Sequence, residues 1–119
     1  MNMISNPALA PTSTVEGVTL GRATLDGDTV VFPGTENGPG QVLFDLDATL
    51  EAGKTYLFAA EITELVNGPV LVMGPGGGSY PIGEDGTARF TATDSGSQIV
   101  VRGGHFTTSC RIRGFTLSD

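Results

Sequence analysis

Tryptophan is absent from this chain of 119 residues, and cysteine and histidine occur once each. A single cysteine, Cys110, excludes both an internal disulfide and a zinc site built from cysteine thiolates. Basic residues are also scarce, because six lysines and arginines against thirteen aspartates and glutamates leave a net charge of −7. Nucleic-acid binding relies on a basic surface that neutralises phosphates. The composition therefore predicts no nucleic-acid partner.

Long apolar stretches are missing as well. No segment approaches the roughly 20 consecutive apolar residues that a membrane-spanning helix needs. The opening stretch, MNMISNPALAPTST, has neither the basic region nor the apolar core of a secretory signal. We therefore expect no membrane partner and synthesis in the cytoplasm.

Helix signals are nearly absent, and alternation of apolar and polar residues takes their place. Runs with this period of two recur about every ten residues and are bounded by glycine, aspartate, asparagine or proline. The segment Asp26-Gly27-Asp28 is typical of a hairpin turn, because Asp-Gly accepts positive φ. We predict an all-β fold, an antiparallel two-sheet β-sandwich of the jelly-roll type. The expected strands cover residues 18–25, 29–32, 41–46, 54–65, 70–73, 88–92, 99–101 and 105–117.

The last expected strand changes parity partway along. Phe106, Cys110 and Ile112 alternate on one face, together with Thr108, whereas Phe115 and Leu117 fall on the other. A β-bulge at Gly114 would return the later residues to the core. We therefore expect Phe106 to be buried and Cys110 to be a buried, inert thiol.

Residues 1–16 contain prolines and polar residues without alternation, which predicts an extended N-terminal arm ahead of a sandwich domain over residues 17–119. Such an arm orders poorly by itself, so we expect it to run across a neighbouring subunit. Its partner-binding anchors would be the apolar residues Ile4, Pro7, Leu9 and Pro11. The arm predicts a homo-oligomer or a multi-copy assembly.

The glycine-rich segment VLVMGPGGGSYPIGEDG, residues 70–86, is a candidate for a phosphate-binding loop. A P-loop needs a second glycine followed by lysine and a helix. Counting from Gly74, the chain has Ser79 at the position of the second glycine, no lysine follows, and Pro81 continues an expected strand. We predict no nucleotide and no other cofactor. A long, flexible loop at the end of a sandwich can still carry contacts, so Gly77, Ser79 and Tyr80 form a possible ligand loop.

Paired acids and the single histidine are the remaining candidates for chemistry. Two carboxylates at suitable separation can hydrolyse glycosides, and carboxylates with carbonyl oxygens can hold calcium. Aspartates also favour turns for conformational reasons, so solvated surface is the preferred interpretation. His105 and Ser109 lack a nucleophile elbow, which makes His105 an ordinary loop residue. We predict no catalytic residue and no metal site; the pairs considered are Asp26/Asp28, Asp45/Asp47 and Glu61/Glu64.

Four of the six bases lie in the last third of the chain: Arg89, Arg102, Arg111 and Arg113. This asymmetry suits complementary contacts between subunits. It is equally typical of the solvated outer face of strands, and both interpretations stay open.

Three segments resemble a known pattern: LEAGKTYLFAAEITEL, GTARFTATDSGSQIVVRGG and CRIRGFTLSD. They are similar to carbohydrate-binding-module-like jelly rolls and to the related domains of bacteriophage virion structural proteins, such as capsid decoration proteins and fibres. The resemblance covers roughly residues 50–119. Its motifs are packing and turn residues, so it implies a fold more than a function.

The function that this resemblance implies is a non-enzymatic virion protein, specifically a capsid decoration or cement protein. Its partners would be the major capsid protein or other virion subunits, and its location the virion. The alternative is a glycan- or receptor-binding module, either in a phage fibre or as a carbohydrate-binding module. Tyr80 is the one aromatic residue expected to be free for stacking on a sugar, which disfavours that alternative.

Overall fold

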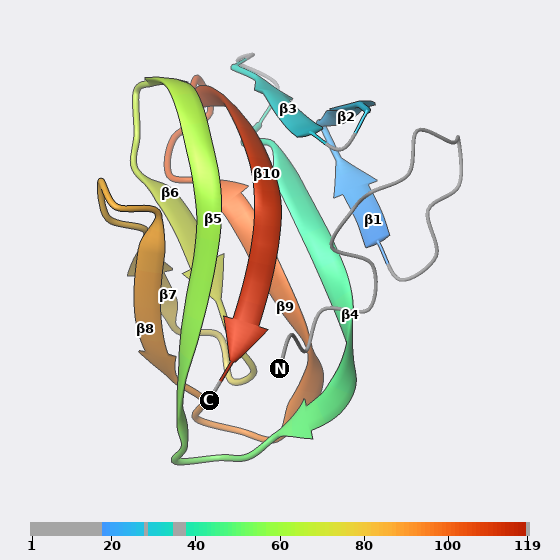
Figure 1. Cartoon of the computed structure of the whole chain (residues 1–119), viewed down its shortest axis with the longest axis vertical. Coiled ribbons are helices and arrows are strands. Elements are labelled where there is room, and N and C mark those ends of the chain that lie inside the picture. Colours follow the sequence, from blue (N-terminus) through green and yellow to red (C-terminus); the bar gives the residue numbers. More distant parts are fainter. Residues whose placement is uncertain (1–17, 28, 35–37, 119) are drawn as a thin grey trace.

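The computed structural model describes residues 18–27, 29–34 and 38–118. These residues form ten strands in two antiparallel sheets, and Figure 1 shows β5 and β10 lying in front of β6 and β9. The all-β, two-sheet sandwich predicted from alternation is confirmed. The strands are β1 (Val18–Gly21), β2 (Thr24–Asp26), β3 (Thr29–Pro33), β4 (Gln41–Leu50), β5 (Thr55–Val66), β6 (Val70–Met73), β7 (Ser79–Pro81), β8 (Thr87–Thr91), β9 (Gly96–Gly103) and β10 (Ser109–Ser118).

Each sheet has five strands. The order β1-β4-β9-β6-β7 makes what we call the β4 sheet, and the order β2-β3-β10-β5-β8 makes the β10 sheet. The chain crosses from one sheet to the other after β1, β3, β4, β5, β7, β8 and β9. Most neighbours in a sheet are therefore distant in the sequence. The expected arm, with Ile4, Pro7, Leu9 and Pro11, lies outside the described residues.

The core lies between the sheets and is built around aromatic rings. The ring of Phe115 on β10 is 4.7 Å from that of Phe44 on β4 and 6.4 Å from that of Phe58 on β5, measured between centroids. These three side chains are fully buried. Truncating such a residue to alanine typically lowers the free energy of unfolding by about 3–5 kcal/mol. The contact between Phe44 and Phe115 thus joins the two sheets.

The first expected strand is divided in the structure. Arg22 has a φ of 50°, in the left-handed region and not in the extended one, and it separates β1 from β2. The two halves then join different sheets, β1 pairing with β4 and β2 with β3. The turn after β2 is as predicted, because Asp26 pairs with Thr29 and Gly27 has a φ of 63°.

The last strand confirms one prediction and corrects another. The register with β5 shifts between Arg113 and Thr116, and Gly114 has a φ of 68°, as expected for a bulge that returns Phe115 to the core. The expectation that Phe106 is buried is wrong, because its side chain is 59% exposed. The strand begins only at Ser109, since Thr108 folds back to close a turn by donating a hydrogen bond from its amide to the carbonyl of His105.

Candidate ligand-binding face

Three apolar side chains form a strip across the outer face of the β4 sheet. Val100 on β9 pairs with Leu43 on β4 on one side and with Met73 on β6 on the other. The residues next to each of them on the same strand point into the core. Because successive side chains of a strand point to opposite faces of the sheet, all three side chains lie on the outer face. We call Leu43, Val100 and Met73 the apolar strip. Each is half-buried, which leaves apolar surface open to a ligand.

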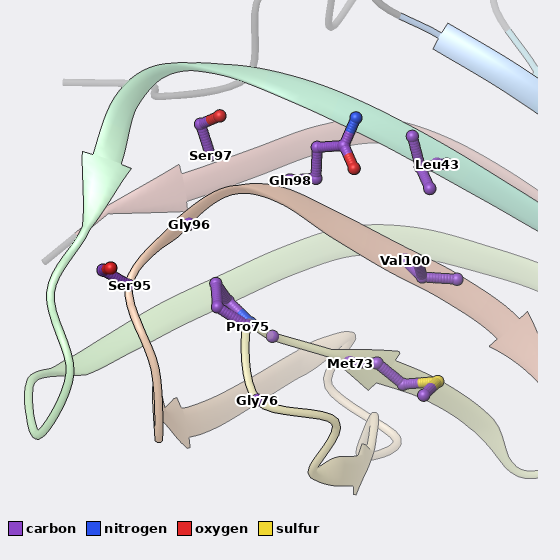
Figure 2. Close-up of a pocket in the computed structure, with 10 residues that line it drawn as sticks. Leu43, Met73, Pro75, Gly76, Ser95, Gly96, Ser97, Gln98 and Val100 are labelled. Carbon is purple, nitrogen blue, oxygen red and sulfur yellow. The ribbon is translucent and has the colours of Figure 1, made fainter.

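A shallow depression of about 360 Å³ lies along this strip. Figure 2 shows its lining side chains, with Leu43, Val100 and Met73 coming from three neighbouring strands. The volume falls at the lower end of the range typical of small-molecule sites, which is about 300–1,000 Å³. Its remaining lining residues are Gly74, Pro75, Gly76, Ser95, Gly96, Ser97 and Gln98.

Polar side chains border the strip on both sides. Toward the β8–β9 turn, the amide of Gln98 donates a 2.7 Å hydrogen bond to Oδ1 of Asp45, and both residues are exposed. In the opposite direction along the strands, Gln41 pairs with Arg102. The face is therefore apolar along its middle and able to make hydrogen bonds along both edges.

The glycines at the end of the depression have a packing reason. A Cβ at Gly74 would lie 2.5 Å from Cε2 of Phe90, and one at Gly76 would collide with the hydroxyl of Thr93. Gly96 has a similar role, because its Cβ would lie 3.1 Å from the ring of Pro75. The amide of Thr93 also donates to the carbonyl of Pro75 at 3.2 Å. Close packing thus accounts for Gly74, Gly76 and Gly96 without a phosphate.

Tyr80 is not the free aromatic residue that the sequence suggested. It lies on β7 opposite Val72, is half-buried, and its ring centroid is 6.1 Å from that of Phe90. Its hydroxyl donates to the carbonyl of Thr91 at 3.4 Å. The period of two explains this position, because Tyr80 follows the outward-facing Ser79 on the short strand β7.

The other two residues of the predicted ligand loop lie near the strip. Ser79 is exposed and pairs with Met73, which puts its side chain beside one end of the strip. Gly77 is exposed in the turn between β6 and β7. Contact of either residue, or of Tyr80, with a ligand stays a prediction.

Among the described acids of the predicted pairs, Asp26, Glu61 and Glu64 contact arginines; Asp28 and the side chain of Asp47 lie outside the described part of the structure. Glu61 receives two hydrogen bonds from the guanidinium of Arg113, at 3.1 and 3.4 Å. Asp26 and Glu64 both contact Arg111, whose pKa is raised chiefly by its hydrogen bond to Asp26. These pairs lie on the outer face of the β10 sheet, where ion pairs in water contribute about 0–1 kcal/mol each.

Among the described residues, no group of three or more histidine, cysteine, aspartate or glutamate side chains is placed to hold a metal ion. His105 lies exposed in the turn before β10. No helix in the described part of the chain has the length and apolar character required to cross a membrane.

The sequence also contains a signal for the apolar strip. Strands with one face in water alternate strictly, but VLF at residues 42–44, VLVM at 70–73 and IVV at 99–101 are apolar at consecutive positions. Consecutive apolar residues indicate a strand with apolar side chains on both faces. Three such segments in neighbouring strands mark an apolar outer face.

The fold is similar to that of a known carbohydrate-binding domain. The match is to the second N-terminal cellulose-binding domain of β-1,4-glucanase C from Cellulomonas fimi, with a TM-score of 0.53 over 98% of this chain and 94% of that chain. The two sequences are 18% identical, so the likeness shows the fold alone. No protein-family model and no curated protein sequence matches the chain.

Proposed function

We propose that this protein is a non-catalytic carbohydrate-binding module whose ligand lies along the apolar strip. The observation that carries the proposal is an apolar strip with polar borders, located on one outer face of a sandwich similar to a cellulose-binding domain. A β-linked glucan presents flat C–H surfaces and a border of hydroxyl groups. Apolar side chains suit the former, and the amide and carboxylate groups of Gln98, Asp45 and Gln41 suit the latter.

The absence of aromatic residues from the strip sets the expected strength of binding. Aliphatic side chains such as Leu43 and Met73 offer less contact area and no stacking with a sugar ring. We therefore expect dissociation constants on the order of 0.1–1 mM for a soluble β-glucan oligosaccharide.

Paired substitutions on the two outer faces test the proposal. Val100→Glu places a charge at the centre of the strip, while Val31→Glu makes the same change at a half-buried position on the outer face of the β10 sheet. Titration calorimetry with β-glucan oligosaccharides should show binding by the natural chain and by Val31→Glu, and at least tenfold weaker binding by Val100→Glu. Met73→Ser gives a milder second test of the strip.

Two results would contradict the proposal. One is equal affinity of Val100→Glu and the natural chain, with both variants folded by circular dichroism. The other is an absence of binding to any β-glucan, xylan or mannan oligosaccharide at millimolar concentration.

A structural protein of a bacteriophage virion is the second candidate function. It is favoured by three exposed apolar side chains at one end of the sandwich: Leu65, Val66 and Phe106. The segments that carry them are joined by a 3.1 Å hydrogen bond from Asn67 to Thr107. Exposed apolar clusters of this kind occur at protein interfaces.

Mass spectrometry of purified virions tests this second candidate. We expect the protein in the particles, and we expect it to be lost from them when residues 1–14 are deleted or when Phe106 is changed to Ser. Particles that lack the protein would eliminate a virion function.

A further inference from the structure

Arg102 occupies a special position on the proposed binding face. It follows Val100 by two residues on β9, so both side chains point outward from the β4 sheet. Its neighbours across the sheet are Gln41 on β4 and Leu71 on β6. Arg102 therefore lies in the row of outward-facing residues next to the apolar strip.

No described residue neutralises Arg102. Its Nε is the one buried side-chain nitrogen or oxygen in the described ranges without a hydrogen-bond partner. Gln41 is oriented toward β1, because a Cβ at Gly21 would lie 3.0 Å from its Cγ and 3.1 Å from its Nε2. Leu71 has no polar group to offer. By contrast, Arg111 and Arg113 on the other sheet are both in ion pairs.

An uncompensated guanidinium next to apolar side chains favours an anionic ligand. A buried donor without a partner is unfavourable, and low polarity around a charge strengthens its attraction to an opposite charge. The side chain is half-buried, so the terminal nitrogens of the guanidinium stay accessible while Nε is covered. The planar fork of arginine matches the planar oxygens of a carboxylate.

We propose that Arg102 binds the carboxylate of a uronic acid in the glycan that lies along the apolar strip. This inference rests on the proposed function and names the ligand class that the site prefers. The net charge of −7 repels a long polyanion. The ligand is therefore a largely neutral oligosaccharide with a single uronate, rather than a polyuronate.

A matched pair of ligands isolates the contribution of the carboxylate to the binding affinity. The probe is a β-linked oligosaccharide with one glucuronate substituent, and the control is the same molecule with the carboxylate reduced to a hydroxymethyl group. Titration calorimetry with the natural chain should give about tenfold tighter binding of the acidic form at low ionic strength. The advantage should shrink as salt is raised, because a half-exposed pair is screened.

Variants at Arg102 and at Arg89 test whether Arg102 causes the preference for the acidic ligand. Arg102→Gln should remove the preference for the acidic form while the reduced form still binds, which also demonstrates that the variant is folded. Arg102→Lys should keep part of the preference, since lysine has the charge without the fork. Arg89→Gln, on an exposed position of β8 in the β10 sheet, should change neither affinity.

The possible outcomes separate the two proposals. Equal affinity of the natural chain for both ligands would overturn the role of Arg102 and leave glycan binding intact. A preference that survives in Arg102→Gln would likewise overturn it. Tighter binding of an O-sulfated counterpart would overturn the assignment to a carboxylate. Failure to bind either form, or any other oligosaccharide, would overturn the proposed function and this inference together.

Discussion

Cys110 shows how burial determines the chemistry of a residue. Its side chain is 3% exposed in the core between the sheets, and burial raises the pKa of its thiol to about 12. The thiolate is the reactive form of cysteine, so the folded protein holds an unreactive thiol at neutral pH. The sequence-based expectation of a buried cysteine is confirmed, and its inertness stays a prediction.

We expect Cys110 to react with a thiol reagent such as dithionitrobenzoate only when the chain unfolds. Above pH 9 the thiol of the unfolded chain ionises while the folded chain retains its proton, so stability should fall as the pH rises from about 9 toward 12. Denaturant unfolding of the natural chain and of Cys110→Ala over this range measures the effect. Rapid labelling of the folded protein at pH 7 would contradict it.

Asp85 illustrates the opposite shift on the surface. Its pKa is lowered from 3.8, first by the hydrogen bond from the Thr87 hydroxyl, at 2.8 Å, and then by the bond from the Thr87 amide, at 3.0 Å. Both donors stabilise the carboxylate. A lowered pKa contributes stability above pH 3.8 that is lost as the pH falls through the folded value.

Thr87→Val should raise the pKa of Asp85 toward its ordinary value, because the hydroxyl that gives the largest effect is removed. An NMR titration of the Asp85 carboxyl measures this directly. Thr91→Val is the matched control on the same strand, since the hydroxyl of Thr91 pairs with that of Thr55 instead. An unchanged pKa in Thr87→Val would refute this account of the turn.

At the scale of elements, the bulge in β10 joins two differently phased halves of one strand. Gly114 has a φ of 68°, in the left-handed region, and a Cβ there would meet no atom within 4 Å. A substitution at Gly114 therefore acts through backbone strain and not through a clash.

Gly114→Ala should lower the free energy of unfolding by about 1–2 kcal/mol, the usual cost of a left-handed conformation for a residue with a Cβ. Gly114→Asn should lower the free energy of unfolding by less than Gly114→Ala does, because asparagine adopts the left-handed conformation more readily than alanine. Chemical denaturation of the three proteins measures the order. A neutral Gly114→Ala would show that β10 can pass the bulge without positive φ at that residue.

The sequence was sufficient to predict those features of the fold that depend on adjacent residues. Asp-Gly at residues 26–27 and the parity change at Gly114 could be interpreted from adjacent residues, and both are found as expected. The exposure of Phe106 could not be predicted in this way, because the alternation of apolar and polar residues continues through the turn in which it lies. That turn is fixed by Thr108, whose hydroxyl donates a 2.6 Å hydrogen bond to the carbonyl of Asn67, a residue far away in the sequence.

At the scale of the whole molecule, the two outer faces differ in character. The β10 sheet carries arginines paired with carboxylates, among them Arg113 with Glu61, whereas the β4 sheet carries the apolar strip and the unpaired Arg102. This difference depends on strand order. The sequence contained each side chain, but not the fact that β9 lies between β4 and β6 or that β10 lies between β3 and β5.

For the same reason the candidate site was missed while the fold was predicted. Alternation assigns residues to faces of a strand, and that was enough for the sandwich. A binding face requires side chains from several strands in register, here Leu43, Val100 and Met73. The ligand loop proposed from the sequence contributes Ser79 near the end of this strip, and Tyr80 lies against the core instead.

Glycan binding along the apolar strip is the central claim, and backbone amide NMR shifts during titration with a soluble β-glucan oligosaccharide test it most directly. We predict saturable shifts at Leu43, Met73, Val100 and their neighbours on β4, β6 and β9, with the outer face of the β10 sheet unaffected. Shifts confined to the β10 sheet or to the turn at Phe106, or no shifts at millimolar ligand, would contradict the account.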